Sequence, residues 1–258
     1  MLRRRGSPDR GLRYLVVVTY GRTGSTVIQA ALNALPGVRI RGENYAALRG
    51  LRQYVQSVAE TASRHHAGRP DHPWYGSARL DPTAVLSDLR RHVLEHLLRP
   101  GQDTEVIGFK EIRYEPGHFS DYHDLLDYLI FLDKLLPGVM YLMNVRDPAA
   151  VARSGWWADQ VDAIASLDLA RARLIEAVDD LNRHFAQPRA VLVAYEDWSV
   201  DPQVLIRAFA DLGLPEDDSA VRNAVMTRLE HGTHPRSRMN SDPDSGAGPE
   251  VVDSGGTP

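Results

Sequence analysis

Residues 14–38, YLVVVTYGRTGSTVIQAALNALPGV, decide the fold of this chain. The stretch begins with β-branched residues typical of a buried strand, passes through a short turn rich in glycine and hydroxyl side chains, and continues into an Ala- and Leu-rich segment. That segment predicts a helix that ends at Pro36-Gly37. This order favours an anion-binding loop, because the amides of the turn and the positive end of the helix dipole converge on one point.

The turn after the strand carries the polar groups that such a loop needs. Gly21 and Gly24 permit close approaches that larger residues do not, and Ser25 and Thr26 supply hydroxyls. The lysine of the common ATP and GTP loop, Gly-x-x-x-x-Gly-Lys-[Ser/Thr], is missing. Arg22 lies early in the turn instead and offers a fork of donors to a tetrahedral oxyanion. The alternative is that the glycines serve only the geometry of a strand–turn–helix connection.

The composition is that of an ordinary globular protein: of 258 residues, 43% are hydrophobic and 25% are charged, with a formal net charge of −4. This length suits one large α/β domain or two small ones. The negative charge argues against a general binder of nucleic acid or membrane surfaces. No stretch approaches the ~20 apolar residues of a membrane span, and no signal-peptide pattern is recognisable. The absence of cysteine excludes disulfides and cysteine nucleophiles. We therefore expect a cytoplasmic enzyme.

Apolar strands and helical segments alternate along the chain. Alternation of this kind predicts a P-loop-like α/β fold with a doubly wound parallel sheet in a single domain. We expect strands at 14–20, 38–41, 105–110, 139–145 and 190–195, and helices at 25–35, near 45–60, at 83–98, 121–136, within 147–186 and at 201–212. The folded domain is expected over 13–231, after a flexible N-terminus at 1–12 and before a polar, disordered tail at 232–258.

A second strand-to-helix segment also carries groups suited to an anion: residues 141–157, YLMNVRDPAAVARSGWW. Arg146 ends the strand, and Ser154 follows it by eight residues. A guanidinium and a hydroxyl in these places would clamp a second phosphate. The alternative is a surface arginine followed by Asp147 as a helix cap. Open parallel sheets bind ligands at the carboxyl ends of their strands, which favours two anion sites at one edge.

The two segments resemble the sulfotransferases that use 3′-phosphoadenosine-5′-phosphosulfate (PAPS). TYGRTGST is similar to their 5′-phosphosulfate loop, in the arginine-containing form of carbohydrate, tyrosylprotein and many bacterial members. VRDPAAVARS is similar to their 3′-phosphate motif, including the step from Arg146 to Ser154. In VAYEDW, Tyr195 matches a tyrosine near the adenine, and VIGFKEIRY matches the central substrate-side strand. The matches follow the family's order from residue 14 to about 215.

The resemblance implies PAPS as the sulfuryl donor, adenosine 3′,5′-bisphosphate (PAP) as a product, and no metal. A transferring sulfuryl group carries less charge than a phosphoryl group, so arginine, amides and hydroxyls suffice to stabilise it. Arg22 takes the electrostatic role at the leaving phosphate. The cradle for the donor is formed by Thr23, Gly24, Ser25 and Thr26, and the remaining donor contacts by Arg146, Ser154 and Tyr195.

The resemblance also suggests a base for the acceptor hydroxyl. The histidine of the phenol-type branch is replaced by Ile112, whereas Glu43 matches the glutamate of the tyrosylprotein and trehalose-type branches. Lys110 resembles the strand lysine that contacts sulfate or the bridging oxygen. The alternatives are that Glu43 is an exposed loop carboxylate, that Lys110 pairs with Glu111, and that a histidine such as His66 or His118 is the base.

Two other functions fit parts of the pattern: a P-loop small-molecule kinase and a non-catalytic nucleotide-binding module. The missing Gly-Lys-[Ser/Thr] argues against the kinase, and the set of Arg22, Glu43 and Lys110 against the module. The HVLEH sequence at 92–96 resembles a zinc motif, but the apolar spacing of its helix already explains it. The expected acceptor is a small hydroxylated molecule, a carbohydrate or natural product, selected by residues 44–82 and 112–128. The sequence predicts no particular oligomeric state.

Overall fold

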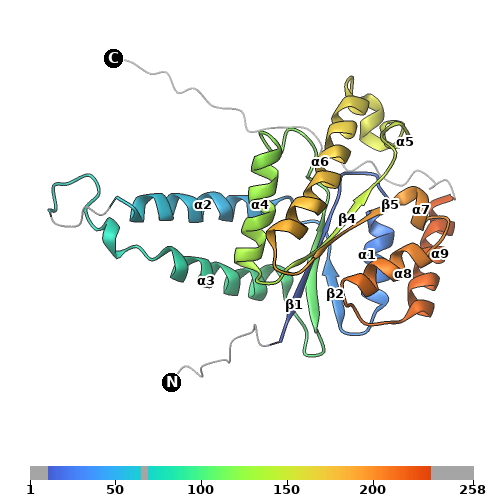
Figure 1. The fold of residues 1–258 in the computed structure, drawn as a ribbon, viewed down its shortest axis with the longest axis horizontal. Coiled ribbons are helices and arrows are strands. Elements are labelled where there is room, and N and C mark those ends of the chain that lie inside the picture. The colour runs from blue at the N-terminus through green and yellow to red at the C-terminus, as the bar shows by residue number, and fades with distance from the viewer. Residues whose placement is uncertain (1–10, 65–68, 234–258) are drawn as a thin grey trace, which may run out of the picture.

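A parallel sheet forms the centre of the molecule (Figure 1). The computed structural model describes residues 11–64 and 69–233, and within them five strands pair in the order β2-β3-β1-β4-β5. All four pairings are parallel, as the sequence predicted. The strands are β1 (Arg13–Val18), β2 (Val38–Arg41), β3 (Val106–Glu111), β4 (Met140–Val145) and β5 (Ala190–Ala194).

Helices cover both faces of this sheet (Figure 1). The α-helices are α1 (Ser25–Ala34), α2 (Ala47–Ala62), α3 (Pro82–His92), α4 (Tyr122–Leu135), α5 (Pro148–Ala152), α6 (Ala163–His184), α7 (Tyr195–Trp198), α8 (Gln203–Asp211) and α9 (Asp218–Thr233). Two 3₁₀ turns, η1 (Ser77–Arg79) and η3 (Gly155–Asp159), and one π-helical segment, η2 (Val93–Leu98), complete the described elements.

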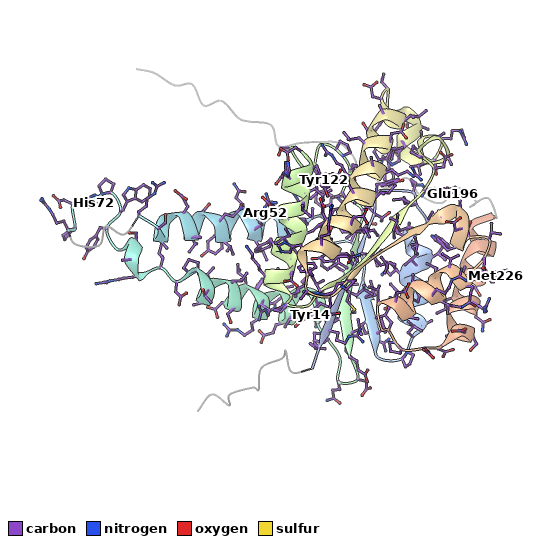
Figure 2. The ribbon with its side chains drawn as sticks, in the orientation of Figure 1. Tyr14, Arg52, His72, Tyr122, Glu196 and Met226 are labelled. Atoms are coloured by element: carbon purple, nitrogen blue, oxygen red, sulfur yellow. The ribbon has the colours of Figure 1, made fainter. Side chains whose placement is uncertain are left out.

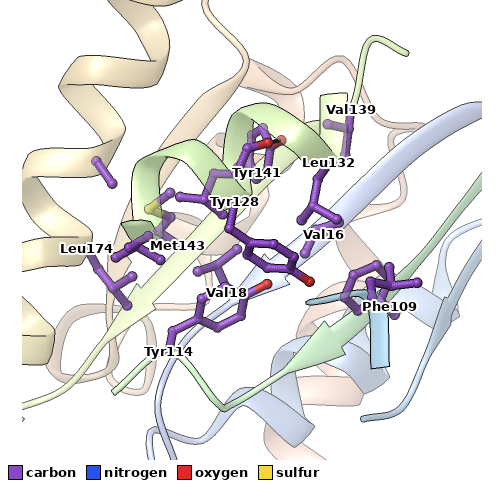
Figure 3. Close-up of a cluster of buried hydrophobic side chains, with 14 of the residues drawn as sticks. Val16, Val18, Phe109, Tyr114, Tyr128, Leu132, Val139, Tyr141, Met143 and Leu174 are labelled. Carbon is purple, nitrogen blue, oxygen red and sulfur yellow. Dashed lines mark hydrogen bonds between the residues drawn. The ribbon is translucent and has the colours of Figure 1, made fainter. Parts of the chain in front are cut away.

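The central strand β1 divides the core in two. Successive side chains of a strand point to opposite faces, so Tyr14, Val16 and Val18 enter one cluster while Leu15 and Val17 enter the other. The first cluster also contains α4, α6 and an aromatic group in which Tyr114 and Tyr128 lie with ring centroids 6.3 Å apart (Figure 3). The second is closed by α1, α8 and α9. Because β1 is buried on both faces, its sequence from residue 14 to 18 is continuously apolar.

Helices α2 and α3 project from the body as an arm (Figure 1). Its base is fixed by Arg52, which pairs with Asp124 on α4 and donates to the Asp124 carbonyl at 2.7 Å (Figure 2). His72 lies at the outer end of this arm, where its Nδ1 accepts a hydrogen bond from the Trp74 amide (Figure 2). A helix of 16 residues spans about 24 Å, so α2 carries His72 away from the strand ends.

Several predicted elements have different boundaries in the structure. The helical region 147–186 divides into α5, η3 and α6, because Gly155 adopts φ 63° and interrupts the helix. The segment 83–98 continues beyond α3 as the π turn η2. Helix α9 has no counterpart among the predictions, although Val221 and Val225 are buried.

Some expectations concern residues that the structure does not describe. These are His66, residues 1–10 of the expected N-terminal extension and residues 234–258 of the expected tail. Among the described helices, none is both long and apolar enough to cross a membrane.

Candidate active site

The β1–α1 loop (residues 19–24) has an unusual backbone. Arg22 has φ 68° and Gly24 has φ 78°, so both lie in the left-handed region. For a residue with a Cβ, such as Arg22, this conformation costs on the order of 1–3 kcal/mol and persists only where neighbours enforce it. Helix α1 then begins at Ser25 with no side-chain cap, which leaves its first amides directed at the loop. The loop therefore has the geometry of an anion cradle.

Aromatic rings explain why the loop needs its two glycines. A Cβ on Gly21 would lie 2.4 Å from the Trp156 ring. A Cβ on Gly24 would lie 2.7 Å from the ring of Tyr195 and 2.9 Å from that of Trp198. The glycines thus allow the backbone to pack directly against these rings, in addition to providing positive φ at position 24.

A buried hydrogen-bond network supports the loop from below. Asn144 on β4, fully buried, donates from Nδ2 to the Thr23 carbonyl at 3.0 Å and accepts from Trp198 Nε1 at 2.9 Å. Thr19 Oγ1 lies 2.7 Å from Thr23 Oγ1 and donates to the Asn144 carbonyl at 2.7 Å. Sequence reasoning identified Thr23 but missed Thr19, Asn144 and Trp198. The available signal was an asparagine within the otherwise apolar strand YLMNV.

Arg22, Arg146 and Ser154 connect the two predicted anion motifs. Arg22 Nε donates to Ser154 Oγ at 3.0 Å, and Arg146 Nη1 donates to the Arg22 carbonyl at 3.0 Å. The Arg146 guanidinium also lies 4.0 Å from the ring centroid of Tyr195. Within the described residues, Arg146 Nε is buried and has no hydrogen-bond partner. A buried guanidinium N–H normally has a hydrogen-bond acceptor, so an anionic ligand at this position would complete the hydrogen bonding of Arg146.

Tyr20 fixes the end of β4 against the loop. Its hydroxyl donates to the Arg146 carbonyl at 2.5 Å and accepts from the Arg146 amide at 2.9 Å. Burial raises the pKa of Tyr20 to about 12, so the phenol keeps its proton and both hydrogen bonds at neutral pH. The sequence did not predict this role, because Tyr20 resembles the other apolar residues of the strand expected at 14–20.

Lys110 lies near the end of β3, and Glu43 lies in the loop that follows the neighbouring strand β2. Lys110, 5% exposed on β3, places Nζ 2.5 Å from Glu43 Oε1, just beyond β2. Arg113 Nη1 approaches Glu43 Oε2 at 3.4 Å and Glu111 Oε1 at 2.8 Å. Lys110 therefore pairs with Glu43 and not with Glu111, which was the alternative. Because β3 pairs with β1, with Val17 opposite Lys110, this cluster borders the β1–α1 loop.

All predicted site residues lie at the carboxyl edge of the sheet. One group surrounds the β1–α1 loop and comprises Arg22, Thr23, Gly24, Ser25, Thr26, Arg146, Ser154 and Tyr195. The second is Glu43 with Lys110. Thr23 and Ser25 are buried, whereas Arg22 and Thr26 are exposed. In residues 11–64 and 69–233, no cluster of three or more His, Cys, Asp or Glu side chains suits a metal ion.

A further carboxylate, Glu115, lies close to this edge in the loop after β3. Its side chain is 19% exposed, Oε1 lies 3.3 Å from His118 Nε2, and Oε2 is buried without a partner among the described residues. Burial raises the pKa of the Glu115 carboxyl to about 7, and the charge of Glu111 adds to this rise. Burial, Arg49 and Arg113 lower the pKa of His118. The Glu115 carboxyl is therefore largely protonated in slightly acidic solution.

We expect the free energy of unfolding of the Glu115→Gln variant, compared with that of wild type, to increase as the pH rises. The raised folded-state pKa of Glu115 contributes stability that is fully present below the unfolded pKa and is lost as the pH rises through about 7. Glutamine does not ionise, so the free energy of unfolding of the variant relative to wild type should increase by about 1–3 kcal/mol between pH 5 and pH 8. Urea unfolding at both pH values measures this, and a pH-independent difference would contradict it.

The two predicted anion motifs lie together at the carboxyl edge of one parallel sheet and are joined through Arg22 and Arg146, which is where open α/β proteins bind their ligands. The sequence matches the sulfotransferase family over residues 15–218. The chain belongs to this family.

Solved structures agree with this fold. The chain is similar to the sulfotransferase domain from the Synechococcus PCC 7002 olefin synthase, with 21% identity, 84% of this chain and 79% of that chain covered, and a TM-score of 0.51. It is also similar to the sulfotransferase domain from the curacin biosynthetic pathway, with 14% identity, coverages of 83% and 77%, and a TM-score of 0.50. At these identities the likeness concerns the fold alone. No curated protein gave a match to the sequence.

Proposed function

We propose that the protein transfers a sulfuryl group from PAPS to a hydroxyl of a small-molecule acceptor, a carbohydrate or natural product. The observation that carries this proposal is the link between the two motifs. Arg146 contacts the Arg22 carbonyl and the Tyr195 ring, and its buried Nε lacks a partner among the described residues. A donor with a 5′-phosphosulfate and a 3′-phosphate supplies anions to both motifs at once.

The donor fits the residues around the β1–α1 loop. The 5′-phosphosulfate would be held by the first amides of α1, by the loop residues Thr23 and Gly24, and by the hydroxyls of Ser25 and Thr26. Arg146 and Ser154 would hold the 3′-phosphate, and Tyr195 would border the adenine. Arg22 is the exposed cation of the loop, and it would stabilise negative charge that develops on the leaving phosphate oxygen.

The acceptor would approach from the side of Glu43 and Lys110. Glu43 takes the proton of the acceptor hydroxyl, the acceptor oxygen forms a bond to sulfur, and the bond from sulfur to the 5′-phosphate oxygen breaks. Lys110, which contacts Glu43, would place its positive charge beside the sulfuryl group during the transfer. Because arginine, lysine and amides supply the positive charge, we propose that the reaction needs no metal.

Calorimetric titration in excess chelator tests this function. PAP is expected to bind more tightly than ATP, because only PAP offers a 3′-phosphate to Arg146. Turnover of PAPS should also persist in the chelator, since no ligand set for a metal occurs in the described residues. Preference for ATP, together with activity restored only by magnesium, would instead support a P-loop kinase.

A further inference from the structure

The β2–α2 loop (residues 42–46), which carries Glu43, is anchored by another carboxylate. Glu111 ends β3 and is 2% exposed. Its Oε2 accepts hydrogen bonds from the amides of Asn44 at 3.2 Å and Ala46 at 2.8 Å. These two amides lie one and three residues after Glu43 in the chain, so Glu111 holds the backbone on the C-terminal side of the proposed base.

The other oxygen of Glu111 binds its own strand end. Oε1 accepts from the amide of Ile112 at 2.9 Å and from that of Arg113 at 3.3 Å, and pairs with Arg113 Nη1 at 2.8 Å. Burial acts to raise the pKa of Glu111, but the Ala46 and Ile112 amides and the Arg113 guanidinium outweigh it and hold the pKa below its usual range. The carboxylate is therefore ionised, and its hydrogen bonds are charge-assisted.

The backbone that Glu111 holds is strained. Tyr45 has φ 57° and Ala46 has φ 55°, two consecutive left-handed residues that both carry a Cβ. Such a conformation requires neighbours that enforce it. Glu111 supplies hydrogen bonds to the amides, and the Arg113 guanidinium lies 4.0 Å from the centroid of the Tyr45 ring. Loss of the carboxylate would remove two of the hydrogen bonds that hold this conformation.

We propose that Glu111 is a positioning residue for Glu43. It fixes the strained β2–α2 loop so that the Glu43 carboxylate remains against Lys110 at the carboxyl edge of the sheet. This inference rests on the proposed function of Glu43. Within the described residues, the hydrogen bonds of Glu111 go to the amides of the loop and of its own strand end and to Arg113, so it acts through the loop.

Glu111→Gln tests the proposal with little change of shape. A glutamine has one acceptor oxygen and an NH₂ group, so it cannot accept from the loop amides and from the strand end at once. We expect kcat to fall by about 10–100-fold, as for a small misplacement of a catalytic group. The dissociation constant for PAP should remain within about 3-fold of wild type, because the donor motifs are untouched. Hydrogen exchange at the peptide covering 42–47 should become faster.

A double-mutant cycle separates positioning from general damage. In a Glu43→Gln background, Glu111→Gln should lower kcat by less than about 3-fold further, because residues that act through one another are not additive. Asp133→Asn is the matched control, since Asp133 also accepts from a backbone amide, Gly138 at 3.0 Å, and pairs with an arginine, Arg189 at 2.7 Å. Gly138 precedes β4, at the opposite end of the strands from Glu43, so this variant should leave kcat nearly unchanged.

Specific outcomes would overturn the inference. A folded Glu111→Gln enzyme with wild-type kcat would do so, as would losses that multiply in the double mutant. If Glu111→Gln does not fold, Glu111→Asp, which keeps the charge but shortens the reach, must show the same fall in kcat. If Glu43→Gln itself turns over normally, the assigned base fails, and the positioning role fails with it. If Glu43→Gln is inactive while Glu111→Gln is active, the positioning role alone fails.

Discussion

Glu43→Gln is expected to lower kcat by about 10²–10⁴-fold, because glutamine keeps the size of the side chain but removes its basicity. PAP binding should hardly change, since the proposed role of Glu43 concerns the acceptor and Glu43 lies outside the residues around the β1–α1 loop. Single-turnover sulfuryl transfer and calorimetric binding of PAP, measured on the same preparation, test both halves of this prediction. Loss of turnover with intact donor binding would support Glu43 as the base.

The ion pair of Glu43 with Lys110 gives Glu43→Gln a second possible effect, which the binding of PAP reports. Glu43 Oε1 lies 2.5 Å from Lys110 Nζ, so Glu43→Gln also leaves a 5% exposed lysine without its carboxylate. If the variant loses PAP binding together with turnover, Glu43 supports the site through this pair and is not the base. If turnover is near wild type, a histidine such as His118 becomes the candidate base, and His118→Gln should then abolish the activity.

The sequence was sufficient for the sheet because the strands have a simple signal. Each of β1, β3 and β4 is buried on both faces along most of its length and therefore has a mostly apolar sequence. Helix α9 lacked such a signal: it packs against α1 and α8, and of its side chains over 218–227 only Val221 and Val225 are buried. The break at Gly155 was also not predictable from periodicity, because it depends on the approach of Arg22, whose Nε would lie 3.2 Å from a Cβ there.

The residues of the candidate site also divide into those that the sequence predicted and those that it did not. Arg22, Arg146 and the loop glycines were predictable because their spacing follows strand ends, where a parallel sheet collects polar groups. Asn144 and Glu111 were not, because each role depends on a partner far along the chain: the carbonyl of Thr23 for Asn144, the amide of Ala46 for Glu111. A single polar residue in an apolar strand indicates a buried hydrogen bond but does not identify its partner.

Arg146→Ala is expected to weaken PAP binding by about 2–4 kcal/mol, because it removes a charge-assisted clamp from a partly buried phosphate. The structure adds a second contribution, since Arg146 Nη1 also holds the carbonyl of the left-handed Arg22. Adenosine 5′-phosphate, which lacks the 3′ group, separates the two. Only the contribution through Arg22 affects its binding, so its affinity should change much less than that of PAP.

Arg146→Lys is the matched variant for this measurement. Lysine keeps the positive charge but lacks the planar fork, so it should recover part of the PAP affinity and little of the hydrogen bond to the Arg22 carbonyl. Ser154→Ala should cost less than Arg146→Ala, because it removes one neutral hydroxyl that already binds Arg22 Nε. Equal losses for PAP and adenosine 5′-phosphate in Arg146→Ala would mean that the arginine only supports the β1–α1 loop. A loss confined to PAP would place the 3′-phosphate at the guanidinium of Arg146, because no other ligand group distinguishes the two nucleotides.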